Sequence, residues 1–159
     1  MSTAPNLPQA VERIPRRCAT VTPYLYVKGA AEAIEFYKNA FGAAELFRMP
    51  WGDKIGHAEI RIRDMILMLA DEAPEHNVLG PKSRGATSAG YLIYFDDVDA
   101  ATERAVGAGA KVVRPPADQF YGDRMATIED PFGHSWTLGS HVEDVSEEEL
   151  NRRMAQQKK

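Results

Sequence analysis

One order of secondary-structure elements occurs twice along the chain. Residues 21–70 contain a short β-rich segment, a segment of helical period that ends at Gly42, and three segments of strand length. Residues 90–140 repeat this order, with Gly109 at the end of the helical segment. A repeat of this kind means that one structural unit is built twice. We therefore predict an α+β fold of two βαβββ modules, joined by a linker over residues 71–89.

The spacing of apolar residues sets the expected elements of each module. The expected strands of the first module are 21–27, 44–49, 54–62 and 65–70. The expected strands of the second module are 91–95, 110–116, 124–130 and 134–140. Each module also has one expected helix, 30–42 in the first and 96–109 in the second. One face of each helix is apolar, formed by Ala33, Ile34, Tyr37 and Phe41 in the first and by Val98, Ala101 and Ala105 in the second.

The two ends of the chain differ in composition from the modules. Residues 1–18 carry three prolines and no apolar period, which predicts a flexible N-terminal segment. Residues 19–142 are then expected to form a single domain that contains both modules. In the polar remainder, 143–159, Ser146 and Glu149 have the spacing of a helix capping box. We expect a short C-terminal helix or tail on the surface.

The composition of the 159 residues argues against several classes of protein. The net charge is −4, and no basic patch is dense enough to indicate a nucleic-acid partner. No apolar run approaches the roughly 20 residues of a membrane span, and the N-terminus lacks the apolar core of a secretory signal. Cys18 is the only cysteine, so no disulfide can form within the chain, and we expect a cytoplasmic protein.

Several segments of the repeat resemble those of a known superfamily. They are PYLYVKGAAEAIEFYKNAFGA in the first module, DPFGHSWTL in the second, and the short stretches HAEI, MLAD and GDR between them. This set resembles the vicinal oxygen chelate superfamily, which includes glyoxalase I, the bleomycin-resistance proteins and the extradiol dioxygenases. From residue 21 to residue 150 the chain looks like the PhnB-like branch. The resemblance implies two modules whose mixed sheets curl into a cup, with helices outside, and commonly a homodimer that shares or completes the cup.

The resemblance also implies where a metal would bind. Metal-dependent members place one His, Gln or Glu ligand on each of four strands that line the cup. The corresponding residues in this chain are Thr22, Met68, Tyr91 and Thr137. None of these side chains is a usual ligand for Zn²⁺, Ni²⁺ or Fe²⁺. We therefore expect no metal cofactor.

A second pattern that looks like a metal site is formed by Glu129, Asp130 and His134. In the last expected strand His134 shares a face with Trp136 and Leu138, and that face is expected to pack under a helix. We therefore interpret Asp130 and His134 as partners of backbone groups in the turn DPFG.

The cup is expected to hold a small molecule. If Thr22 marks the inward face of the first strand, Tyr24 and Tyr26 point inward as well. The same rule assigns further side chains to the cup, which are Ile66, Met68, Tyr91, Ile93, Phe95, Ser135 and Thr137. Apolar and aromatic walls with a few hydroxyls are typical of small-molecule pockets. The alternative is that these rings fill a closed core.

His57, Glu59 and Arg61 share one face of the expected strand 54–62. If this face looks into the cup, His57 and Glu59 could act as a base and its orienter, or hold a polar group of a ligand. If it looks outward, it is an ordinary solvated strand face. Arg124, next to the turn YGD, is a candidate for the rim of the cup, where it would hold an anionic group, or else a surface arginine.

Three functions are compatible with these patterns. The first is metal-independent binding of a small, partly aromatic molecule in the cup. The side chains expected to contact that molecule are Tyr24, Tyr26, His57, Met68, Tyr91, Phe95, Arg124 and Thr137. The second is a lyase, isomerase or dioxygenase with an atypical metal or base site around His57 and Glu59. The third is a structural or partner-binding dimer without a ligand. We expect a homodimer, because association would cover strand edges and apolar rims.

Overall fold

The computed structural model describes residues 13, 15 and 18–157. Most of the expected flexible segment, residues 1–18, lies outside the described residues. The first module consists of β1 (Tyr24–Val27), α1 (Ala30–Phe41), β2 (Ala44–Trp51), β3 (Lys54–Ile62) and β4 (Met65–Asp71). The second module consists of β5 (Gly90–Tyr94), α3 (Val98–Gly107), β6 (Lys111–Asp118), β7 (Asp123–Glu129) and β8 (Ser135–His141). Every expected strand and helix of the modules is present, within a few residues of its expected bounds.

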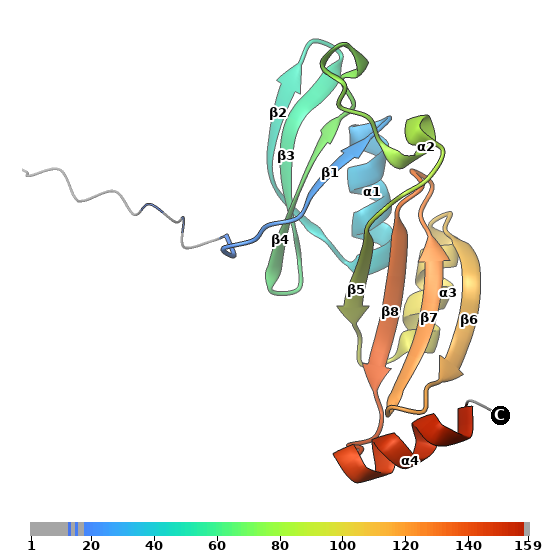
Figure 1. Cartoon of the computed structure of the whole chain (residues 1–159). Helices are drawn as coiled ribbons and strands as arrows, with labels where there is room; N and C mark the ends of the chain where they lie inside the picture. The colour runs from blue at the N-terminus through green and yellow to red at the C-terminus, as the bar shows by residue number, and fades with distance from the viewer. Residues whose placement is uncertain (1–12, 14, 16–17, 158–159) are drawn as a thin grey trace, which may run out of the picture.

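Each module forms one four-stranded mixed sheet (Figure 1). The strand order is β1-β4-β3-β2 in the first sheet and β5-β8-β7-β6 in the second. The pairs β1–β4 and β5–β8 are parallel, and the other pairs are antiparallel. The predicted fold of two βαβββ modules is thus confirmed, with two open sheets that do not close on each other within the chain.

The hydrophobic core lies between the helices and the sheets. Helix α1 packs on the first sheet, α3 packs on the second, and the two helices contact each other. The apolar residues predicted to form one face of each helix are all buried. Gly42 ends α1 in the left-handed conformation, with φ of 68°, as its position in the sequence predicts. Helices α1 and α3 therefore cover one face of each sheet, and no described helix packs on the opposite face.

The linker 71–89 contains more regular structure than its sequence predicts. It includes a 3₁₀ turn, η1 (Pro74–His76), and a short helix, α2 (Pro81–Arg84). The Glu72 carboxylate accepts hydrogen bonds from the Gly80 backbone N–H at 3.0 Å and from the Ser83 hydroxyl at 2.8 Å. These bonds hold α2 close to the end of β4. They order a segment whose sequence shows no apolar periodicity.

The C-terminal segment carries helix α4 (Glu147–Gln157), which lies beyond the end of the second sheet (Figure 1). Ser146 Oγ accepts a hydrogen bond from the Glu149 backbone N–H at 3.3 Å, as the capping box predicts. Arg153 connects this helix to the rest of the chain through Glu143, at 2.7 Å. None of the helices that the structure describes is long and apolar enough to cross a membrane.

Candidate functional site

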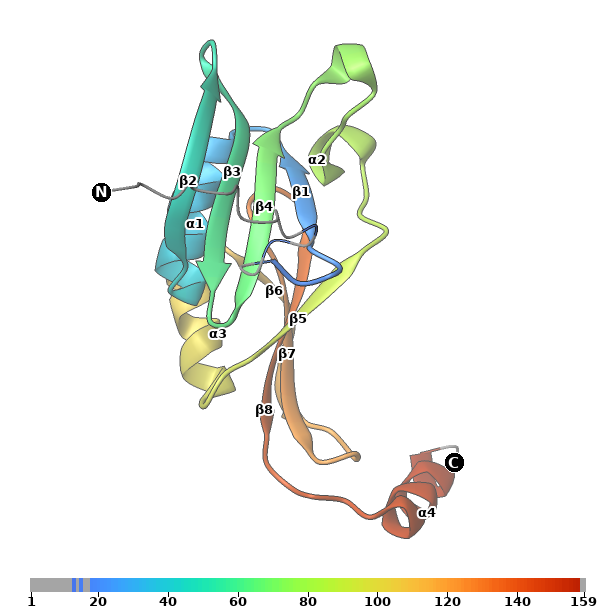
Figure 2. The ribbon, with the colours of Figure 1, turned by 90° about the vertical axis from the view of Figure 1, so that its left-hand side faces the viewer.

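Among the described residues, no helix covers the face of the first sheet that turns away from α1, and we call it the open face (Figure 2). Residues of β1 alternate between the two sides of the sheet. Leu25 and Val27 are buried in the core, whereas Tyr24 and Tyr26 expose 37% and 38% of their surface. The centroids of the two tyrosine rings are 5.1 Å apart. The two tyrosines therefore form an aromatic pair on the open face, as the alternation along the strand predicts.

Strand pairing places polar side chains on the same open face. Met68 lies in register beside Tyr24 on one side and beside Glu59 on the other. Residues in register point to the same side of a sheet, and so do residues two apart on one strand. The face formed by His57, Glu59 and Arg61 is therefore the face that carries Tyr24, and not the helix-covered face.

His57 contacts both Tyr24 and Glu59. The Tyr24 hydroxyl oxygen lies 2.8 Å from His57 Nδ1, which is a hydrogen bond. Nε2 of the same imidazole lies 3.6 Å from Glu59 Oε1, and Glu59 is buried. Burial, with a smaller effect of the neighbouring Tyr26, raises the pKa of the Tyr24 hydroxyl. Tyr24 is therefore a neutral phenol at neutral pH.

A cavity of about 330 Å³ lies against this face. Tyr24, Tyr26 and Trp51 line it from the sheet. From the chain that follows β4 it is lined by Glu72, Ala73, Glu75, His76 and Val78. Trp51, in the turn WGD, exposes 75% of its surface. The cavity therefore brings three aromatic rings together with the polar residues at the start of the linker.

Two of the expected site residues in the second module lie on the helix side of their sheet. The ring of Tyr91 packs on Trp136, with centroids 4.8 Å apart, and Phe95 lies 6.3 Å from the ring of Phe41 in α1. The prediction that Tyr91 and Phe95 share a face equivalent to that of Tyr24 is therefore wrong. In the segment YLIYF every residue is apolar or aromatic. The sequence therefore has no polar–apolar alternation that would indicate which face of the strand is buried.

The open face of the second sheet carries Leu92 and Tyr94 instead, which expose 49% and 46% of their surface. Thr137 lies in register beside Leu92 and therefore also belongs to the open face. Leu92 and Tyr94, together with Tyr91, line a cavity of about 440 Å³ at the junction of the modules. Tyr91 thus lines a different cavity from Tyr24, and in the part of the chain that the structure describes the two residues do not share the connected cavity that we predicted.

Tyr94 belongs to a hydrogen-bonded group that the sequence analysis missed. Its hydroxyl donates to Asp123 Oδ2 at 2.8 Å, and Asp123 Oδ1 contacts His141 Nδ1 at 2.8 Å. Hydrogen bonds to Asp123 and Asp144 raise the pKa of His141. One signal could have identified Tyr94, because it matches Tyr26 when the two modules are aligned from their helices backwards.

The strand register also revises one of the four metal positions. Gly90, and not Tyr91, is the counterpart of Thr22 in the second module. The Thr22 hydroxyl donates to the backbone oxygen of Ala19 at 2.9 Å. The four positions therefore offer hydroxyls, a thioether and a glycine, a set that does not fit Zn²⁺, Ni²⁺ or Fe²⁺. Among the described residues no three His, Cys, Asp or Glu side chains are grouped so that they could hold a metal ion.

Arg124 lies on the helix side of the second sheet. Its guanidinium donates to both carboxylate oxygens of Asp99 in α3, at 2.7 and 2.9 Å, and to Asp118 at 2.9 Å. Its neighbour Asp123 faces the open side, and alternation along the strand turns Arg124 to the opposite side. The predicted position at the rim of a cup is therefore wrong, and two carboxylates already neutralise this arginine.

Asp130 has the structural role that we predicted. The His134 imidazole instead faces another strand, with its Nε2 at 3.4 Å from the backbone oxygen of Tyr26 in β1. Asp130 Oδ1 accepts hydrogen bonds from the backbone N–H groups of Phe132 and His134, both at 2.9 Å. Asp130 Oδ2 accepts hydrogen bonds from the Tyr37 hydroxyl and from Trp136 Nε1, both at 2.8 Å. Burial lowers the pKa of the His134 imidazole, although the Asp130 carboxylate acts in the opposite direction. These two residues connect the turn to the core.

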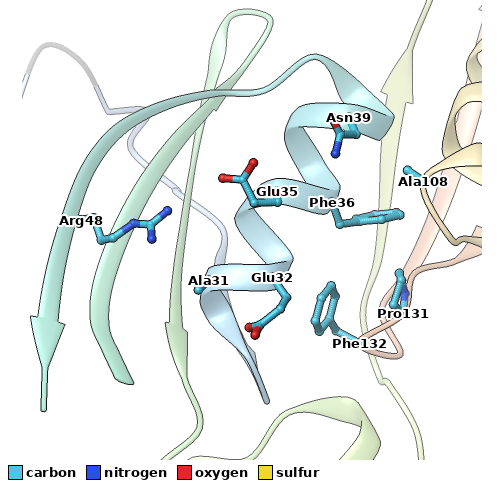
Figure 3. A pocket seen from close by; sticks show the side chains of 9 residues that line it. All are labelled: Ala31, Glu32, Glu35, Phe36, Asn39, Arg48, Ala108, Pro131 and Phe132. Atoms are coloured by element: carbon cyan, nitrogen blue, oxygen red, sulfur yellow. The ribbon is translucent and has the colours of Figure 1, made fainter. Parts of the chain in front are cut away.

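A wider depression of about 510 Å³ lies on the outer surface of α1 (Figure 3). Glu35 of α1, Phe132 of the turn and Arg48 of β2 are among its lining residues. Arg48 pairs with Glu45 at 2.7 Å, and Glu35 pairs with Lys38 at 2.9 Å. The residues that line this depression do not include Tyr24, Tyr26 or His57, so we place the candidate site on the open face of the first sheet.

Comparison with known proteins agrees with this architecture. A model of the Glyoxalase/Bleomycin resistance protein/Dioxygenase superfamily matches residues 17–138. The uncharacterized protein Rv0887c of Mycobacterium tuberculosis (strain ATCC 25618 / H37Rv) is 42% identical over 141 residues, which cover 86% of this chain and 83% of that protein.

Solved structures share the fold. TioX from Micromonospora sp. ML1 matches with a TM-score of 0.63 and 26% identity, over 78% of this chain and 99% of TioX. The fosfomycin resistance protein FosX from Listeria monocytogenes matches with a TM-score of 0.60 and 18% identity, over 83% of this chain and 97% of FosX. The repeat, the sheet topology and the family match lead to one conclusion: the chain belongs to the glyoxalase/bleomycin resistance protein/dioxygenase superfamily.

Proposed function

We propose that the protein binds a small, partly aromatic molecule on the open face of the first sheet, without a metal ion. The observation that carries this proposal is the exposed pair Tyr24 and Tyr26 beside a cavity of about 330 Å³ that Trp51 also lines. Aromatic rings that are half exposed at a cavity offer stacking surface, and each stacked pair contributes about 0.5–1.5 kcal/mol beyond the burial of area. The polar contact nearest to the rings is the Tyr24–His57 hydrogen bond.

We propose further that the working form is a homodimer in which a second copy covers part of the open faces. Large apolar side chains are exposed on both sheets, and they include Phe47, Met49, Trp51, Leu92 and Tyr94. Exposed apolar patches of this kind mark interaction or ligand sites in soluble proteins. Light scattering should give twice the chain mass of 17.6 kDa. A mass of one chain over a wide concentration range would contradict the dimer.

The PhnB-like branch and a cytoplasmic location are also proposals. The first is supported by the segments that the chain shares with that branch from residue 21 to residue 150. The second is supported by the single cysteine, Cys18, because proteins that work in oxidising compartments are often stabilised by disulfides.

Ligand-induced thermal stabilisation tests the binding function. A compound that binds only the folded state raises the melting temperature. We expect aromatic and amphipathic compounds to stabilise the wild-type protein, and Trp51→Ala to reduce that stabilisation. Tyr121→Ala is the matched control, because Tyr121 is an exposed aromatic residue in the equivalent turn YGD of the second module. Equal loss in both variants, or no stabilisation by any compound, would contradict the proposal.

A second candidate function is favoured by one contact. His57 lies between Tyr24 and the buried Glu59, an arrangement that suits a general base and its orienting carboxylate. The chain would then be a lyase, isomerase or dioxygenase with an atypical site. Elemental analysis of the purified protein separates the candidates. About one Zn, Ni or Fe per chain, lost in His57→Ala, would favour the enzyme over the metal-independent binding protein.

A further inference from the structure

Three side chains form a row that leads from the open face into the sheet. Tyr24 exposes 37% of its surface. The side chain of His57 exposes 21%, and that of Glu59 exposes 5%. The row spans β1 and β3, with β4 between them, so three strands must keep their register for the contact to exist. The sheet therefore fixes the position of Tyr24 relative to His57.

The two ring nitrogens of His57 face different partners. Nε2 faces Glu59 Oε1 at 3.6 Å, which is too long for a hydrogen bond but close enough for the carboxylate to repel a lone pair on Nε2. A proton on Nε2 removes this repulsion, so we assign the Nε2–H form to the neutral imidazole of His57. Nδ1 then carries the lone pair, and it accepts the proton of the Tyr24 hydroxyl across 2.8 Å.

The Tyr24 hydroxyl thus donates its one hydrogen bond within the protein, to His57. A phenol hydroxyl has one proton to donate and two lone pairs that accept. With its O–H donated to His57 Nδ1, the Tyr24 oxygen offers only lone pairs to a ligand on the open face. The raised pKa of Tyr24 keeps this oxygen a neutral acceptor rather than a phenolate.

We propose that this site selects ligands that bring a hydrogen-bond donor to Tyr24. The ligand class is aromatic or amphipathic alcohols, phenols and amines, in preference to ethers and ketones of the same shape. The inference rests on the proposed function, because it names the ligand class of the same site.

A matched pair of compounds tests the selection. Naphthol and its methyl ether, methoxynaphthalene, share one ring system, but only naphthol can donate a hydrogen bond. The two dissociation constants are measured by calorimetry on the full-length protein at one fixed pH. The quantity of interest is the ratio of the two constants, because the added methyl group changes the affinity of every variant in the same way.

Tyr24→Phe keeps the ring and removes the acceptor oxygen. We expect this variant to lower the preference for naphthol about threefold to tenfold, which is the range of one net hydrogen bond. Tyr121→Phe is the control, because it removes a hydroxyl from an exposed tyrosine that does not line the cavity and should leave the ratio unchanged. His57→Leu frees the Tyr24 proton to point at the ligand, so it should shift the preference toward the ether. An unchanged ratio in Tyr24→Phe, or equal changes in Tyr24→Phe and Tyr121→Phe, overturns the inference while the proposed function stands.

A second measurement needs no ligand. Nitrogen NMR of the labelled protein identifies the protonated ring nitrogen of His57, whose signals are assigned by their loss in His57→Leu. We expect the Nε2–H form with an unprotonated Nδ1. The Nδ1–H form overturns the inference and leaves ligand binding untouched. Failure of both compounds, and of every other aromatic compound tested, to bind the wild-type protein overturns the proposed function and the inference together.

Discussion

The Tyr37 hydroxyl in α1 donates a hydrogen bond to Asp130 Oδ2 across 2.8 Å and thereby joins the two modules. Both residues are fully or almost fully buried. Tyr37→Phe removes the donor and leaves a buried carboxylate with one partner fewer. We expect the free energy of unfolding to fall by about 1–3 kcal/mol, measured by urea denaturation. Tyr121→Phe, at an exposed tyrosine, is the control and should stay within about 0.5 kcal/mol of wild type. Equal losses in the two variants would show that the contact between the modules contributes nothing.

The same contact makes stability depend on pH in the alkaline range. Burial, and after it the Asp130 carboxylate, raises the pKa of Tyr37 well above 10.0. A raised pKa in the folded state gives a stability contribution that is complete below the unfolded pKa of 10.0 and is lost as pH rises through the folded pKa. The stability difference between wild type and Tyr37→Phe should therefore be constant up to about pH 9 and shrink above about pH 10. Urea titrations of both proteins at each pH measure it, and a difference that grows with pH would contradict the assignment.

His141 should give a second pH dependence, near neutrality. Hydrogen bonds to Asp123 and Asp144 raise the pKa of His141 above 6.5, so its contribution is complete below pH 6.5 and is lost as pH rises through the raised pKa. Burial of Asp123 favours its neutral form, but the hydrogen bonds from His141 and Tyr94 outweigh burial and hold the pKa of Asp123 below 3.8. Its contribution is therefore complete above pH 3.8 and is lost as pH falls through the lowered pKa.

The raised pKa of His141 and the lowered pKa of Asp123 together define a pH range in which His141→Gln should destabilise the protein most. The stability difference from wild type should be largest between about pH 4 and pH 6.5 and should shrink toward about pH 8. Denaturant midpoints at several pH values measure this difference. His76→Gln, at an exposed histidine in η1, is the control and should show no such window. The assignment fails if the His141→Gln difference is the same at pH 5 and pH 8.

The turns WGD and YGD look alike in sequence but differ in what covers them. Gly52 and Gly122 both have positive φ, 62° and 98°. A Cβ at Gly52 meets nothing within 4 Å, whereas a Cβ at Gly122 would overlap the Glu143 carbonyl oxygen and contact the side chain of Val145. Gly52→Ala should cost about 1–2 kcal/mol, from backbone conformation alone. Gly122→Ala should cost more and should release the segment after β8, visible as faster hydrogen exchange there. Equal costs and unchanged exchange would mean that the segment does not depend on this turn.

Alternation of residue types along single strands predicted most of the fold and the part of the candidate site that lies on β1. In β1, tyrosines alternate with buried aliphatic residues, so the period placed Tyr24 and Tyr26 on the correct face. In β5 every side chain after Gly90 is apolar or aromatic, and there the inward face was assigned one residue away from its true position. The partners of Arg124 come from α3 and β6, which no local pattern reveals. The Tyr24–His57 contact likewise depends on the pairing of three strands, and alternation within one strand carries no information on it.

Tyr26→Ala separates a binding face from a closed core. Tyr26 exposes 38% of its surface and borders a cavity, whereas the adjacent Leu25 exposes 1%. Truncation of a residue that already borders open space creates no new internal void, so Tyr26→Ala should cost less than about 1.5 kcal/mol of stability. Leu25→Ala, the matched control on the same strand, should cost about 2–5 kcal/mol. Chemical denaturation curves of both variants measure these values.

The same variant should weaken binding, because the lost ring removes a stacking partner worth about 0.5–1.5 kcal/mol. Calorimetry with naphthol should therefore show a dissociation constant about twofold to tenfold higher for Tyr26→Ala than for wild type. If Tyr26 instead filled a closed core, its truncation would cost about 3–5 kcal/mol, like that of other buried aromatic residues. A loss of that size, with no ligand found in a broad screen of aromatic compounds, would end the binding hypothesis for this face.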